Sequence, residues 1–474
     1  MEEPQSPALS NFARQIMPDI ARSVKLDDTI SSQLAIDAIG SLCANCSSDE
    51  ADIFVATLDM ILEAYKQSNK DLVVTAVIAM SRIVPLLGIR IVPHLPTLVS
   101  QTLELRLDSG AQREDQVNDL LAAAAINFFA VLLESIPAFM PTYAADVIVF
   151  AVRVPRFTEQ IKMAQVKLQE AYTDCLRSKG AILSAVEAIN QCMDLNLSSA
   201  YVLSTLEKVL SKSNRVDITN CLESIVPAFL CVFDNRAGNS PECISCLMQM
   251  VLKLNDTTFR PIFGRMYNWA SDNNAIDDEK RVRRLTAFYS SFKQLLLKLK
   301  SIITQYYATA LNTSIEILKN ANNVNGLNDL VLETLRLSFK NDAEDFWQLE
   351  TRFTPVANVL LDLLERSSLP VPEVAGALVD LATTASSANH FKSINERLLV
   401  MMRSESVVSQ TAAIKAQYMF YTSMGNEWIT FLPQSVPVIG ELLETHDEHV
   451  ENETRLLVKA IESILGESMD KYLS

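Results

Sequence analysis

Glycine is scarce in this chain of 474 residues, with 11 in all, and no run alternates apolar and polar residues with the period of two that strands show. The sequence contains no GxxxxGK[ST], GxGxxG or GxSxG motif and no kinase signature. These absences exclude strand-rich folds and the common phosphate-binding and hydrolase classes. We therefore expect helices nearly throughout and no catalytic site.

Targeting and membrane signals are also missing. The opening residues MEEPQSPALS have neither the basic nor the apolar region of a signal peptide. The longest apolar run, from Leu120 to Leu133, is interrupted by Asn127 and is shorter than the roughly 20 residues that cross a bilayer. We expect a soluble intracellular protein that does not bind membranes.

Metal-ligating residues are few and poorly placed. The chain has only four histidines, and its eight cysteines lie in apolar helical stretches, which is typical of reduced thiols that pack in a core. Two CxxC pairs and one HDEH turn contain residue types that ligate zinc, namely Cys43 and Cys46, Cys243 and Cys246, and His446 and His449. The pairs favour core packing and the turn favours solvation, so we expect no metal and no cofactor.

What is present is a succession of apolar stretches with helical periodicity, divided by short polar breaks. Pro93 and Pro141 stand 48 residues apart at comparable helices, and Pro227 follows 86 residues later, about two more units of the HEAT or armadillo kind. In the last unit Asp447 is placed to cap a helix over residues 448–465. The fold class predicted is all-α, an α-solenoid of degenerate HEAT-like helix pairs.

The C-terminal half is expected to contain some long helices. The periodicity predicts helices over 258–270, 279–319, 326–340, 345–366 and 428–445. The polar stretch 271–278 is the nearest thing to a break between blocks of helices. Helix pairs of this kind bury an apolar face only by stacking on their neighbours, and the stack leaves a long surface that suits large partners.

Charge is distributed unevenly along the chain. The net charge is -16, yet the segment 260–300 has nine basic and four acidic residues, which gives it +5 and leaves -21 for the rest. An apolar stripe runs along the predicted helix there, and Arg281 lies in phase with it, where we expect an ion pair with Asp277. The basic residues expected to point away from the stripe are Lys280, Arg283, Lys293 and Lys298.

These four outward cations are the candidate binding residues. They could contact RNA phosphates, dock an acidic protein segment, or remain solvated, and the sequence leaves all three alternatives open. No interleaved exposed aromatics and no RNA-binding motif support recognition of a base sequence.

A family resemblance covers about the last 217 residues. The run FRPIFGRMYNWA, the basic RVRRLTAFYSSFKQLLLKLKSIITQYY and the closing GESMDKYL are similar to the C-terminal domain of the large HEAT-repeat U3 small nucleolar RNA-associated protein of the UtpA subcomplex. We accordingly divide the chain into a HEAT-like array, residues 1–257, and the family's C-terminal helical domain, residues 258–474. Members of this family are much longer chains, so this one resembles a C-terminal fragment.

The resemblance implies a non-catalytic nucleolar scaffold of the small-subunit processome, required for processing of the 18S rRNA precursor. It implies as partners the other UtpA subunits, several of them β-propeller proteins, together with the 5′ external transcribed spacer and the U3 particle. No membrane and no small-molecule substrate are implied. The alternative is a nuclear transport receptor or a phosphatase-type scaffold of HEAT repeats, and an enzyme would require a deep polar pocket with perturbed titratable groups.

Overall fold

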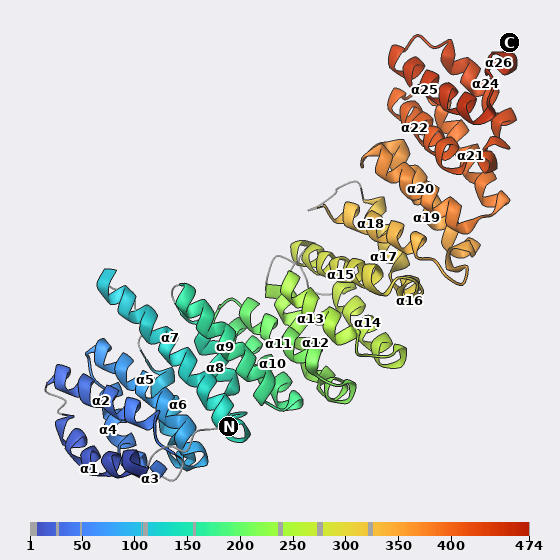
Figure 1. The fold of residues 1–474 in the computed structure, drawn as a ribbon. Coiled ribbons are helices and arrows are strands. Elements are labelled where there is room, and N and C mark those ends of the chain that lie inside the picture. The colour runs from blue at the N-terminus through green and yellow to red at the C-terminus, as the bar shows by residue number, and fades with distance from the viewer. Residues whose placement is uncertain are drawn as a thin grey trace. The chain divides into compact units, whose positions relative to one another are not determined.

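The computed structural model describes residues 7–24, 28–47, 50–105, 107, 112–154, 158–235, 240–272, 278–320 and 326–473. Within these ranges the chain consists of helices and short connections, with no strand (Figure 1). The predicted all-α class is confirmed. Packing divides the chain into unit 1, Met1–Asn235 with Pro241–Phe259, and unit 2, Arg236–Ser240 with Arg260–Ser474. The family-based division between residues 257 and 258 stays a prediction.

Unit 1 contains the first thirteen α-helices and the start of α14. Their bounds are α1 Pro7–Ser23, α2 Thr29–Cys43, α3 Ala51–Val55, α4 Leu58–Tyr65, α5 Lys70–Leu87, α6 Leu95–Leu103, α7 Gln112–Ser135, α8 Ala144–Val152, α9 Glu159–Cys175, α10 Ser178–Asp194, α11 Ala200–Lys212, α12 Arg215–Asn235 and α13 Pro241–Val251. Short 3-10 helices occupy Gly88–His94 (η2) and Pro137–Phe139 (η3).

Unit 2 begins within α14 and contains the remaining helices. Their bounds are α14 Asp256–Ser271, α15 Asp278–Leu299, α16 Ser301–Thr304, α17 Tyr307–Lys319, α18 Leu327–Lys340, η5 Phe346–Gln348, α19 Glu350–Arg366, α20 Val371–Ala385, α21 Ala388–Met402, α22 Val407–Met424, α23 Asn426–Ile429, α24 Leu432–Leu443, α25 Glu448–Leu465 and α26 Asp470–Leu473.

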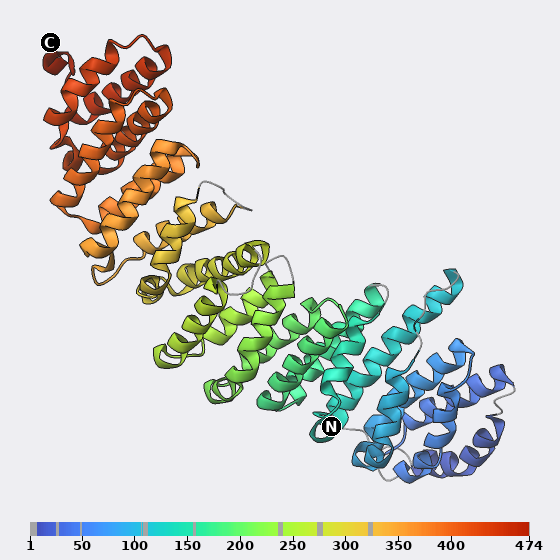
Figure 2. The same cartoon turned by 180° about the vertical axis from the view of Figure 1, so that it is seen from behind.

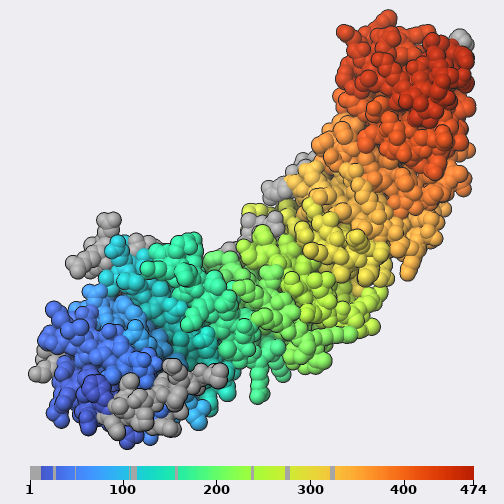
Figure 3. Space-filling model, viewed as in Figure 1, coloured from blue at the N-terminus to red at the C-terminus, as the bar shows by residue number. Residues whose placement is uncertain are grey.

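Each unit stacks its helices in two layers. In unit 1, α2, α5, α7 and α9 pack in succession in one layer, and α8, α10 and α12 pack in the other (Figures 1 and 2). In unit 2 the corresponding layers are α15, α18, α20, α22 and α25, and α17, α19, α21 and α24. The space-filling view in Figure 3 shows the same succession within each unit as contiguous bands of colour. This is the expected solenoid of helix pairs.

The helix ends follow from local chemistry. The Asp447 carboxylate accepts hydrogen bonds from the His449 and Val450 N–H groups at 2.9 and 3.1 Å, so the predicted N-cap of α25 is confirmed. Gly466 ends the same helix at φ 72°, a conformation that glycine adopts without a Cβ penalty. The apolar residues Val450, Leu457 and Ile461 of α25 are buried, at the spacing of one helix face.

The single helix predicted over 279–319 is wrong. The chain forms three helices there, because Lys300 adopts φ 50° and turns the backbone between α15 and α16, and a second turn at Gln305–Tyr306 precedes α17. Apolar periodicity continues through both turns, since Ile303 and Tyr306 are buried. Because the apolar periodicity continues across both turns, it does not indicate where the helix is broken.

The predicted start of the helix 345–366 is also wrong, because α19 begins at Glu350. The Asp342 carboxylate accepts hydrogen bonds from the Phe346 and Trp347 N–H groups, both at 3.2 Å, and diverts the chain into the 3-10 turn η5. Short acidic side chains compete in this way with helix formation.

By length and composition alone, three described stretches could cross a membrane, which differs from the expectation based on the length of the run from Leu120 to Leu133. They are Lys70–Leu103, Asp115–Ser135 and Arg215–Asn235. The middle stretch lies in α7, whose Phe128, Phe129 and Leu132 are fully buried, and α7 packs between α5 and α9. In this fold the apolar side chains serve contacts between helices.

Candidate binding surface

Helix α15 positions the four predicted binding residues. Its buried face consists mainly of the predicted stripe, with Leu285, Phe288, Phe292, Leu295 and Leu296 all at most 4% exposed. Phe263 of α14 packs against this face, at 5.5 Å from the Phe288 ring centroid and 5.2 Å from that of Phe292. The stripe predicted from the sequence is therefore the surface that attaches α15 to its neighbours.

The four cations differ in their surroundings. Lys298 is exposed, whereas Lys280 and Arg283 are half-buried, and the Arg283 Nε is buried without a hydrogen-bond partner in the described part of the chain. Lys293 lies 2.7 Å from the Glu333 carboxylate of α18, and its side chain is only 26% exposed. Four residues spread over 18 positions of one helix span about 27 Å, so they form a row and not a compact cluster.

Arg281 does not face open solvent. It is half-buried, its Nε has no hydrogen-bond partner among the described residues, and its expected partner Asp277 lies outside them. Arg281 lines a cavity of about 690 Å³ with Asp278, Glu316 and Lys319. Both signs of charge line this cavity, so it does not select anions.

Other cations of the basic segment serve contacts within unit 2. Arg284 stacks over Trp269 at 5.0 Å and donates a hydrogen bond to the Trp269 carbonyl at 3.1 Å, which links α15 to α14. Arg260 lies over the Tyr306 ring at 5.6 Å. The positive charge of the segment therefore has structural uses, and the exposed Lys298 is the candidate residue best placed to reach a partner.

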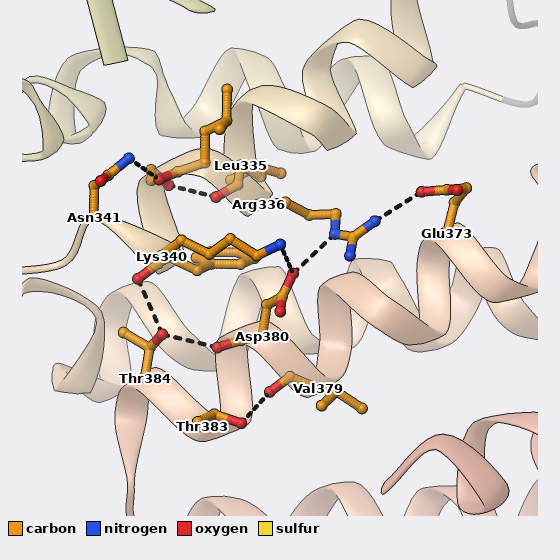
Figure 4. Close-up of polar contacts among 12 residues, drawn as sticks. Leu335, Arg336, Lys340, Asn341, Glu373, Val379, Asp380, Thr383 and Thr384 are labelled. Atoms are coloured by element: carbon orange, nitrogen blue, oxygen red, sulfur yellow. Dashed lines mark hydrogen bonds and ion pairs between the residues drawn. The ribbon is translucent and has the colours of Figure 1, made fainter. Parts of the chain in front are cut away.

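The interface of α18 and α20 contains an ion-pair network that the sequence analysis missed (Figure 4). The Arg336 Nε lies 2.9 Å from Asp380, and its Nη1 lies 2.7 Å from Glu373. Lys340 reaches the same Asp380 carboxylate at 3.5 Å. A Cβ at Gly376 would stand 3.0 Å from the Arg336 Nη2, so glycine there leaves room for the guanidinium beside α20. The sequence contained one indication of this network, since Arg336 and Lys340 are four residues apart and therefore lie on the same face of one helix.

Two cavities flank the connection between α18 and α19. One of about 420 Å³ lies beside the ion-pair network, between Lys340, Asp342 and Thr383. Another of about 820 Å³ lies on the side of α16, with Ile302 and Arg352 among its walls. Burial raises the pKa of Asp342, although hydrogen bonds from the backbone of Trp347 and Phe346 oppose that effect.

The CxxC cysteines lie in or beside the packed core, and the two histidines lie on either side of Asp447, which caps α25. Burial raises the pKa of Cys43 to about 12, with a further contribution from Cys46, and it raises the pKa of Cys243 well above its usual range. Cys43, Cys243 and Cys246 are buried, as expected for thiols that pack in a core. Among the described residues no three side chains of His, Cys, Asp or Glu are grouped to hold a metal ion. His446 is exposed in the turn before α25, and His449 is exposed in the first turn of that helix.

Comparison with known proteins gives relatives over nearly the whole chain. The family described as BP28CT (NUC211) domain matches residues 221–347. U3 small nucleolar RNA-associated protein 10 of Schizosaccharomyces pombe is 31% identical over 97% of this chain and 29% of its own length, and the Saccharomyces cerevisiae protein of the same name is 26% identical over 98% and 28%. The chain thus spans less than a third of these relatives.

Among solved structures, this chain is similar to the karyopherin Kap121p. Kap121p bound to RanGTP gives a TM-score of 0.48 at 13% identity, covering 98% of this chain and 51% of Kap121p, and Kap121p bound to Pho4p gives 0.47 at 13%, covering 100% and 53%. The relatives found by sequence carry the family assignment. This chain is homologous over nearly all of its length to proteins named U3 small nucleolar RNA-associated protein 10, so the resemblance noted in residues 258–474 is confirmed and extends through the preceding helices.

Proposed function

We propose that this chain is a non-catalytic scaffold of the small-subunit processome in the nucleolus, where it supports processing of the 18S rRNA precursor. The observation that carries the proposal is the 31% identity over 97% of the chain to a protein named for its association with U3 small nucleolar RNA. The partners would be other UtpA subunits, the U3 particle and the 5′ external transcribed spacer.

The structure supports binding rather than catalysis through the uses of its ionisable groups. Burial between helices raises the pKa of tyrosines and cysteines such as Tyr65 and Cys246, and these residues belong to the packed core. Arg336, Glu373 and Asp380 hold neighbouring helices together. Stacked helix pairs present a large surface of this kind to macromolecular partners.

Within this function we propose that Lys280, Arg283, Lys293 and Lys298 contact the phosphate backbone of precursor RNA. The net charge of +5 over 260–300 in an acidic chain supports this assignment, because phosphate contacts release counterions and require no base recognition. The exposed Lys298 would contact phosphate directly, and Lys293 would have to share its charge between RNA and Glu333.

The test is affinity purification of the tagged chain from nuclear extract, with quantification of U3 RNA, spacer RNA and co-purifying proteins. We expect enrichment of U3 RNA and of β-propeller UtpA subunits over a tagged, unrelated helical-repeat protein. Release of bound proteins by a GTP-loaded small GTPase, without U3 RNA, would instead identify a transport receptor. A chain that captures neither U3 RNA nor processome proteins would refute the scaffold function.

A further inference from the structure

The 820 Å³ cavity between α16 and α19 of unit 2 is an open groove with unusual walls. Its main side chains are Ile302 on α16, Glu344 and Asp345 on the connection after α18, Phe346 in η5, and Leu349 and Arg352 at the start of α19. Ile302 is 62% exposed and Leu349 is 52% exposed. Two large aliphatic side chains thus border one concave surface of unit 2.

The α16 wall of the groove is firmly held. Ile303 and Thr304 are each 1% exposed, and the Thr304 hydroxyl donates a hydrogen bond to the Asn341 carbonyl at 2.9 Å, which ties α16 to the end of α18. With these two residues turned inward on a helix of four residues, Ile302 must face outward. Its exposure is therefore a consequence of a packed helix and not of a loose one.

The opposite wall is held by Trp347, which is fully buried. Its ring lies 4.9 Å from that of Phe339 and 5.6 Å from that of Tyr307. The backbone N–H of Trp347 donates a hydrogen bond to the Asp342 carboxylate, and this bond together with the buried ring constrains the connection, in which Glu344 and Asp345 adopt φ of 65° and 54°. Such conformations cost non-glycine residues on the order of 1 kcal/mol or more and persist only where the surroundings enforce them.

The charges of the groove indicate what would bind there. Asp345 accepts a hydrogen bond from the Gln348 side-chain amide at 2.8 Å, and Glu344 is exposed. Arg352, the one cation in the wall, lies 3.8 Å from the Phe346 ring centroid and donates a hydrogen bond to the Phe346 carbonyl at 3.0 Å. Its charge is thus held on the aromatic ring, while the carboxylates remain available to a ligand.

We infer that this groove docks a short basic segment of a partner protein, with an aliphatic side chain placed between Ile302 and Leu349 and a lysine or arginine placed against Glu344 and Asp345. A volume near 820 Å³ accommodates a few side chains. The acidic rim disfavours RNA, whose phosphates would meet two carboxylates before one stacked arginine. The inference rests on the proposed scaffold function only in requiring a protein partner.

The test uses the full chain and a phage-displayed library of random twelve-residue peptides as the probe. Selection is made on the native protein and counter-selection on the double variant Ile302→Glu/Leu349→Ser, which places a carboxylate and a helix-capping serine at exposed sites. We expect enriched peptides that combine aliphatic residues with lysine or arginine. Their dissociation constants should rise at least tenfold with the double variant, and several-fold with Glu344→Gln/Asp345→Asn.

A matched control is Val400→Ser, which removes an aliphatic side chain that is 65% exposed on α21 of the same unit. This variant should bind the enriched peptides like the native chain, and circular dichroism should give all variants the same helix content. Should no peptides be enriched, or should they be acidic, or bind the double variant equally well, the docking inference is overturned. A 12-nucleotide RNA that competed with the peptides would overturn the choice of a protein partner. Co-purification of U3 RNA is scored separately, so failure here leaves the proposed function intact.

Discussion

Both units join neighbouring helices by apolar packing and by ion pairs, but the ion pairs within their layers differ in exposure. In unit 1, α7 lies between α5 and α9 with Ala122, Ala125 and Phe129 buried, so small and aromatic side chains form much of the contact. An ion pair from Arg82 of α5 to Asp37 of α2 also bridges this layer, but its side chains are 41% and 60% exposed. In unit 2 the pairs within the layer are less exposed: Lys293 of α15, paired with Glu333 of α18, is 26% exposed, and Arg336 of α18 and Asp380 of α20 are 26% and 21% exposed. Apolar stacking favours contact of any kind, whereas an ion pair also fixes which residues face one another.

This difference explains two properties of the sequence. Apolar packing around α7 gives unit 1 helices with the hydropathy of membrane spans. In unit 2 the charged rows mean that a basic helix such as α15 cannot be interpreted from charge alone, because Arg284 and Lys293 are used between helices. Only the charged side chains of unit 2 that are not engaged between helices are free to contact a partner.

The largest expected effect is loss of apolar packing in unit 1. Phe129 is fully buried and its ring lies 5.5 Å from that of Phe150, so Phe129→Ala should destabilise unit 1 by about 3–5 kcal/mol. Hydrogen exchange should show faster exchange in α7 to α9 and little change in α18 to α22, because repeats chiefly stabilise their neighbours. Phe139→Ala, at a residue 44% exposed in the same unit, is the matched control. Uniformly faster exchange in both units would contradict the comparison.

The sequence predicted the architecture well, for a reason visible in α25. Apolar residues at helical spacing and an aspartate at the turn are local signals, and Val450, Leu457, Ile461 and Asp447 behave as their spacing indicated. The breaks within the predicted 279–319 helix could not be predicted, since the positive φ of Lys300 depends on what α16 contacts. Tertiary packing decides such turns.

The candidate site was less predictable. A helical wheel shows which side of a helix faces away from its own apolar stripe, but it does not show a neighbouring helix that covers that side. Lys293 was expected to point away from the apolar stripe of its own helix, and there it meets Glu333 of the neighbouring helix α18. The groove beside α16 also escaped detection, because Ile302 and Leu349 are 47 positions apart and only the fold brings them to one cavity.

A smaller effect is expected from the charged interface of α18 and α20. Asp380→Ala removes the shared partner of Arg336 and Lys340, whose side chains are 26% and 56% exposed, and should cost about 1–3 kcal/mol. A double-mutant cycle of Asp380→Ala with Arg336→Ala, followed by urea unfolding, should give a coupling energy of about 1 kcal/mol. A coupling energy near zero would mean that this network does not fix the register of the two helices.

The row of cations on α15 should matter little for stability and more for binding. Lys293→Glu replaces the ion pair with Glu333 by two like charges, and adding Glu333→Lys restores a pair of opposite charges, so the free energy of unfolding of the double variant should lie within about 1 kcal/mol of that of the native chain. Lys298→Glu, at an exposed position, should change stability by no more than about 0.5 kcal/mol. Recovery of spacer RNA with each variant measures binding. If Lys298→Glu left RNA recovery and its salt dependence unchanged, direct phosphate contact by this residue would be ruled out.

The smallest effect is expected at a surface ion pair of unit 2, whose side chains are 52% and 56% exposed. Arg403 contacts both carboxylate oxygens of Glu441 at 2.9 Å, and its hydrogen bond holds the pKa of Glu441 below the usual range. A carboxyl group whose pKa is lowered by folding contributes stability that is fully present above its unfolded pKa and is lost as the pH falls through the folded pKa. We expect Arg403→Ala to return the pKa of Glu441 toward its ordinary value, as measured by carboxyl NMR titration. High salt should produce part of the same rise in the native chain, because exposed pairs are screened. A titration of Glu441 that is identical in the two proteins would show that this pair is not populated in solution, and that ionic contacts in unit 2 act only where burial shields them.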